Sequence, residues 1–153
     1  MTSEDQASGP RIFRVGDPGI PNEGIIVGRG GGFTQIFDDI VLLPDGIVRF
    51  MSYTAFNSPT IPEDFESVRL LTEEPGQFEE FVTRLDRIGF RNIKLPPPTS
   101  SGLEYIVLIE QDKDVHAVIW ALGAIDAVPK KLGSVVRSIR SSVAKGFKRT
   151  HGR

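Results

Sequence analysis

The chain has 153 residues, of which 39% are hydrophobic and 25% are charged, and its net charge at pH 7 is −2. These values are ordinary for one globular domain, and they exclude a fibrous repeat or a wholly disordered chain. The sequence has no cysteine, which excludes disulfides, thiolate metal ligands and cysteine nucleophiles.

The beginning of the chain is polar and acidic. Residues 1–24 are rich in Gly, Pro, Ser and acidic residues, so we expect a flexible N-terminal arm before a single domain at 25–147. A secretory signal would instead carry positive charge and then an apolar run. The longest apolar run, 117–125, is too short to cross a bilayer. We therefore expect a cytoplasmic protein with no transmembrane segment.

Residues 28–37 read GRGGGFTQIF, and the four glycines raise the question of a phosphate site. A P-loop needs Lys and then Ser or Thr after its glycines, and both it and the dinucleotide fingerprint continue into a helix. Here Phe33 and Thr34 lead into a strand-like segment. The glycines therefore indicate a bulge, a tight bend, or a place in a strand where another backbone approaches closely. Phe33 is then either an anchor at an exposed tip or a core residue.

Alternation and turn residues predict a first set of strands. Segments 24–28, 36–43 and 47–53 are the candidates, with a short edge strand possible at 68–71. Pro, Asp and Gly at 44–46 predict a tight turn, so the second and third segments should form a hairpin.

Several signals predict a helix over 72–89. Thr72 is suited to the N-cap, and acidic residues follow it in the first turn. Gly89 can adopt the left-handed conformation that ends a helix, and Phe90 can then pack back on the helix.

The second half of the chain contains another hairpin. Three prolines at 96–98 predict a rigid extended connector. Strands are predicted at 103–111 and 115–122. The first of these contains YIVLI, which is apolar on both sides, so we expect a central strand that is covered on both faces.

A last helix should begin after Pro129, with one apolar and one basic side. Residues 129–153 hold eight Lys and Arg and no acid, so subtracting eight charges from −2 leaves −10 for the rest of the chain. The basic surface consists of Lys130, Arg137, Lys145 and Lys148, and 148–153 is expected to be a basic tail. Nucleic acid is disfavoured as a partner, because the only aromatic residue here, Phe147, lies near the apolar stripe.

These elements predict an α+β fold. We expect an antiparallel β-sheet of four to five strands, with two helices packed on one face.

We find no catalytic or metal-binding pattern in the sequence. There is no GxSxG nucleophile motif, and His116 is better explained as a strand residue than as a ligand. The adjacent pairs Asp38–Asp39 and Glu79–Glu80 point apart, so they are interpreted as solvated charges. We expect no enzyme activity, no metal and no cofactor.

The order of these signals resembles the emfourin-like proteins, which are proteinaceous inhibitors of thermolysin-like metallopeptidases. The resemblance covers about 25–143, and the matching residues are Gly31, Gly32, Phe33, Thr34, Pro97, Pro98, Ser101, Gly102, Tyr105, His116, Val118, Pro129 and Leu132. The sequence departs from the family pattern at Gln35, where a glycine is often found. The acidic residue expected before the tyrosine is matched only in part by Leu103 and Glu104.

The resemblance implies a non-enzymatic binding protein, with Gly31, Gly32, Phe33 and Thr34 as the protein-binding residues. The expected partner is a metallopeptidase. The alternative is an accessory subunit of a larger host complex, which would dock through the N-terminal arm and the basic helix and tail.

Overall fold

A computed structural model describes residues 20–32, 36–54, 66–69, 77–99, 101–111 and 114–151. The strands are β1 (Gly24–Gly31), β2 (Ile36–Leu42), β3 (Ile47–Thr54), β4 (Glu66–Arg69), β5 (Gly102–Ile109) and β6 (His116–Ala121). The helices are α2 (Gln77–Arg87) and α3 (Lys130–His151), and short 3-10 turns are η1 (Phe90–Asn92) and η2 (Ile125–Ala127).

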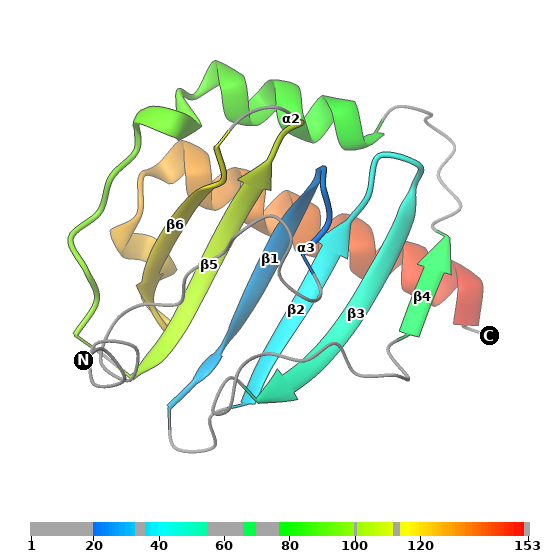
Figure 1. Ribbon diagram of the computed structural model, residues 1–153, viewed down its shortest axis with the longest axis horizontal. Coiled ribbons are helices and arrows are strands. Elements are labelled where there is room, and N and C mark those ends of the chain that lie inside the picture. The colour runs from blue at the N-terminus through cyan, green and yellow to red at the C-terminus, as the bar shows by residue number, and fades with distance from the viewer. Residues whose placement is uncertain are drawn as a thin grey trace.

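The strands form one antiparallel sheet in the order β4-β3-β2-β1-β5-β6. Both helices lie on the same face of this sheet (Figure 1). The α+β fold with two helices on one face is therefore confirmed. The sheet has six strands, one more than the upper limit that we expected. The edge strand β4 pairs with β3 and begins two residues before the expected position, 68–71.

The sheet is apolar on both faces. On the helix face, β1 presents Ile25 and Val27, which pack with Leu85 of α2 and Ile139 of α3. The other face has its own buried cluster, which consists of Ile26, Phe37, Val41, Met51, Leu103, Tyr105, Val107 and Ile109. All eight residues of β5 are buried. This confirms the prediction of a central strand that is covered on both faces.

The predicted turns and helix end have the expected local geometry. In the β2–β3 turn, Gly46 has φ 88°, and its N–H donates to the Leu43 carbonyl oxygen at 3.0 Å. After α2, Gly89 is left-handed (φ 71°, ψ 40°) and Phe90 is 1% exposed. The predicted N-cap, Thr72, lies outside the described residues.

Two elements extend further than predicted. Strand β1 continues through the glycines to Gly31 instead of ending at residue 28. Helix α3 continues to His151, past the expected start of the tail at residue 148, and no proline interrupts this segment. Within the described segments, no helix is long and apolar enough to cross a membrane.

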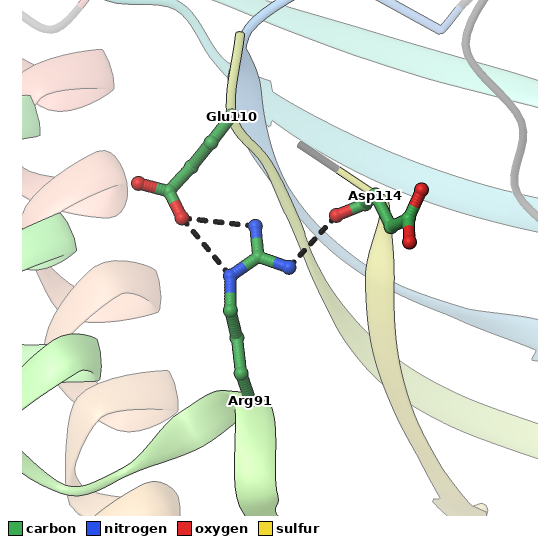
Figure 2. Close-up of polar contacts among 3 residues, drawn as sticks. All are labelled: Arg91, Glu110 and Asp114. Atoms are coloured by element: carbon green, nitrogen blue, oxygen red, sulfur yellow. Dashed lines mark hydrogen bonds and ion pairs between the residues drawn. The ribbon is translucent and has the colours of Figure 1, made fainter. Parts of the chain in front are cut away.

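An arginine ties the helix layer to the β5–β6 hairpin. Arg91 of η1 donates from Nε (3.0 Å) and Nη2 (2.9 Å) to Oε1 of Glu110, and from Nη1 to the carbonyl oxygen of Asp114 at 2.8 Å (Figure 2). Glu110 follows β5 and Asp114 precedes β6. One side chain therefore holds both ends of this hairpin connection, which gives Arg91 a structural role.

Candidate protein-binding site

The glycine-rich bend begins from a fixed base. The last residue pair between β1 and β2 is Gly31 with Ile36, and Gly31 also pairs with Gly102 of β5. The N–H of Gly32 donates to the Ser101 carbonyl oxygen at 2.9 Å. Gly31 and Gly32 have φ 87° and 70°, which other residues adopt only with strain. Both ends of the bend are thus held by neighbouring strands.

The structure places the predicted binding residues unevenly. Gly31 and Gly32 lie together at the end of the sheet, where β1 and β2 join. Phe33 and Thr34 lie outside the described residues. Whether Phe33 is a surface anchor or a core residue therefore stays a prediction.

Gly28 leaves room for an aromatic ring that crosses its strand. It pairs with Tyr105 of β5 on one side and with Asp39 of β2 on the other. The Tyr105 hydroxyl donates to Asp39 Oδ1 at 2.5 Å. A Cβ atom at Gly28 would lie 2.1 Å from that oxygen and 2.6 Å from Tyr105 Cε1. Only glycine is compatible with this hydrogen bond across the strand.

Gly30 is a second point of close approach. A Cβ atom there would lie 2.4 Å from both the Ile36 carbonyl oxygen and Phe37 Cα. Because these are main-chain atoms, they cannot move aside as a flexible side chain could. The prediction that another backbone approaches the glycines closely is confirmed at Gly30, whereas the groups that approach Gly28 are side chains, which the prediction did not include.

The interpretation of Asp39 as a solvated charge is wrong. Asp39 is 2% exposed, whereas Asp38 is exposed on the opposite face. Phe37, Asp39 and Val41 alternate along β2 and share the buried face. The alternation in IFDDIVLL already indicates that Asp39 shares a face with Phe37 and Val41. The Tyr105 hydroxyl gives the buried carboxylate a hydrogen-bond donor.

Two exposed apolar side chains flank the end of the sheet. Ile36 is 42% exposed and Leu122 is 50% exposed. Leu122 lies over Gly102, because a Cβ atom there would be 3.2 Å from Leu122 Cδ2. With the pairs described above, the residues Ile36, Gly31, Gly102 and Leu122 form a row across β2, β1, β5 and the end of β6. We call this row the glycine platform.

Two residues of the glycine platform, Ile36 and Leu122, are exposed, whereas Gly31 is half-buried and Gly102 is buried beneath Leu122. Ile36 follows the alternation of Ile40 and Leu42, whose side chains face the helices. This end of the sheet extends beyond both helices (Figure 1). At about 4.8 Å per strand, the Cα positions of Ile36 and Leu122 lie about 14 Å apart. Because the Leu122 side chain covers Gly102, Gly31 is the glycine that lies between the two exposed side chains. A partner's main chain could therefore approach Gly31 between two apolar contacts.

A polar row lies next to the platform on the same face. Asp38 pairs with Arg29, Arg29 with Glu104, and Glu104 with Trp120. Glu104 is 5% exposed, and its Oε1 accepts a hydrogen bond from Trp120 Nε1 at 2.7 Å. This bond satisfies a buried charge, which indicates a structural role for Glu104.

Arg140 of α3 interacts electrostatically with two residues of this row, Glu104 and Arg29. Burial lowers the pKa of Arg140, and the nearby positive charge of Arg29 adds to that decrease, while the Glu104 carboxylate acts in the opposite direction. Desolvation is the largest of these effects. The guanidinium is thus held partly out of water beside a buried carboxylate.

The predicted basic surface lies on α3 and not at the platform. Lys130, Arg137 and Lys145 are exposed, and Arg137 donates to Asp126 Oδ1 at 3.1 Å. Lys148 lies within α3, but its side chain is outside the described set.

His116 has structural partners in the sheet border. Its Nε2 donates to the Ile93 carbonyl oxygen at 3.1 Å, and its ring meets Phe90 edge-on with centroids 5.0 Å apart. Among the residues that the structure describes, no group of three or more His, Cys, Asp or Glu side chains could hold a metal ion.

No protein-family model matches the chain, and no curated protein matches it. The resemblance to the emfourin-like proteins therefore stays a prediction.

Proposed function

We propose that this chain is a non-enzymatic binding protein that contacts its partner through the glycine platform and the adjoining bend with Phe33 and Thr34. The observation that carries the proposal is the exposure of Ile36 and Leu122 on either side of Gly31 at the end of the sheet. Exposed apolar side chains that surround a site of close main-chain approach are suited to binding a polypeptide.

The fixed base of the bend supports this function energetically. Gly31 is paired on both sides, and Gly32 is hydrogen bonded to Ser101. Because the ends of the bend are already ordered, binding loses less conformational entropy than it would with a free loop. The Tyr105–Asp39 bond, three positions along β1 from Gly31, stiffens the same part of the sheet.

The partner that we propose is a thermolysin-like metallopeptidase, and the expected effect is inhibition. The resemblance described above supports this choice of target. In this proposal Phe33 enters the substrate cleft of the peptidase, and Ile36 and Leu122 contact the rim of the cleft. The buried carboxylates Asp39 and Glu104 are committed to internal hydrogen bonds, which supports a role other than catalysis.

A titration of casein cleavage tests the proposal. The purified protein, added to a thermolysin-like peptidase, should abolish cleavage near equimolar ratio. The variants Phe33→Ala and Ile36→Ser/Leu122→Ser should inhibit less while keeping the fold. The exposed connector variant Lys94→Ser is the control and should inhibit like the wild type.

The results distinguish inhibition of the peptidase from binding to a protein partner through the glycine platform. Unchanged cleavage at excess protein would remove the inhibitor proposal. Binding without inhibition, measured by calorimetry, would keep the platform as a binding site and reject only its effect on catalysis.

A further inference from the structure

Helix α3 presents a row of basic and hydroxyl side chains away from the sheet. Its apolar side is buried on the sheet: Leu132, Val135, Val136, Ile139 and Val143 are 0–3% exposed. The exposed side contains Lys130, Lys131, Ser134, Arg137, Ser141 and Lys145, which we call the cationic strip.

Most of the charge on the cationic strip is not neutralised within the protein. Arg137 pairs with Asp126. In the part of the chain that the structure describes, Lys130, Lys131 and Lys145 form no ion pair with an acidic residue. No acidic residue follows Asp126 in the sequence. Four cations and one carboxylate leave a local charge of +3 on the strip.

The first turn of α3 adds to this positive potential. It contains no acidic residue, and Lys130 and Lys131 lie there instead. Cations are unfavourable at this end of a helix, where the backbone dipole is already positive. An anionic partner would relieve this repulsion.

The width of the strip favours one kind of anionic partner. Helix α2 packs beside α3 and is joined to it by a hydrogen bond from Gln77 to Ser142. It exposes three carboxylates, Glu79, Glu80 and Asp86, and one cation, Arg87. Neighbouring helices lie only about 8–10 Å apart. A membrane surface or a nucleic-acid duplex is wider than one helix, so it would also lie over α2. The carboxylates of α2 would repel such a negatively charged surface. A single peptide segment is narrow enough to lie on α3 alone and to avoid the carboxylates of α2.

Other features of the strip agree with a peptide. Its apolar side is unavailable for insertion into lipid, because the sheet covers it. None of its six residues is aromatic, so it offers no surface on which bases could stack. At 1.5 Å per residue, the strip extends about 22 Å from Lys130 to Lys145, which matches a short peptide.

We propose that the cationic strip of α3 binds an acidic segment of a partner protein. Complementary charge steers such a segment onto α3, and the acidic residues of α2 restrict where it can lie. This surface is separate from the glycine platform, so the proposal does not depend on peptidase inhibition.

A fluorescence-anisotropy titration with a labelled oligo-glutamate peptide tests this inference. We expect binding at low salt that weakens steadily as salt is added. The variant Lys130→Glu/Lys145→Glu should bind about ten-fold more weakly or worse. The control Arg87→Glu/Lys94→Glu changes net charge equally at exposed positions outside the strip and should bind like the wild type.

Three outcomes would overturn the proposal: no binding of the peptide at low salt, equal weakening by both double variants, or tighter binding of a short DNA duplex or of phosphatidylserine vesicles. Circular dichroism checks that each variant is folded. If the charge reversal disturbs the fold, Lys130→Gln and Lys145→Gln should still weaken binding, while Lys94→Gln should not.

Discussion

The substitution Gly28→Ala tests the role assigned to the glycines in β1. The new methyl group would lie 2.1 Å from Asp39 Oδ1 and 2.6 Å from Tyr105 Cε1. Both side chains are buried, with Asp39 2% and Tyr105 0% exposed, so neither has free space to move into. The Tyr105–Asp39 hydrogen bond must therefore break or the strands must shift.

The expected loss of stability follows from three contributions. A hydrogen bond to a charged group contributes about 1.5–3 kcal/mol, and overpacking a core costs about 1–3 kcal/mol. Replacing glycine in a strand returns about 0.5–1 kcal/mol of backbone entropy. The net decrease in the free energy of unfolding should be about 2–5 kcal/mol, which is large for a domain of this size.

Urea unfolding followed by the fluorescence of Trp120, which is 4% exposed, measures this decrease. Gly133→Ala is the control, because its nearest neighbouring atom would be 3.6 Å away and the residue is helical. That variant should be stabilised slightly. In a Tyr105→Leu background, the cost of Gly28→Ala should fall by more than half. A change below about 0.5 kcal/mol for Gly28→Ala alone would refute the reasoning.

Three further substitutions test the polar contacts. Tyr105→Phe removes the hydroxyl that donates to Asp39 and should cost about 1–3 kcal/mol in urea unfolding, and an unchanged midpoint would contradict the proposed role of this bond. Trp120→Phe leaves buried Glu104 without its indole donor. It should lower the free energy of unfolding, measured by thermal denaturation with circular dichroism, by about 1–3 kcal/mol. No loss would mean that the carboxylate finds another donor. A lysine at position 91 cannot donate two parallel hydrogen bonds as the planar guanidinium does, so Arg91→Lys should lower the free energy of unfolding by about 1 kcal/mol in the same assay. Wild-type stability would show that the hydrogen bonds of Arg91 to Glu110 contribute little.

Locally determined features could be predicted from the sequence. The β2–β3 turn depends on Pro, Asp and Gly within a few positions, and the end of α2 depends on Gly89 and Phe90. The apolar pattern of α3 specifies its buried side directly. Such features need no knowledge of which strands are neighbours.

The candidate site depends on sheet register, which the sequence does not state. Gly28 interrupts an apolar pattern, so the strand was expected to end there. It continues because β5 and β2 bring Tyr105 and Asp39 to either side of this glycine. The glycine platform likewise joins residues from four separate segments, and the exposure of Leu122 follows from where β6 ends. Long-range pairing, and not local propensity, creates this surface.

Amide hydrogen exchange on the complex with a thermolysin-like peptidase tests most directly whether the glycine platform is the contact surface. We predict that binding slows exchange at Gly31, Gly32 and Ile36 and at Gly102 and Leu122, and leaves the exposed side of α3 unchanged. Slower exchange confined to α3, with the platform exchanging as in the free protein, would contradict the account.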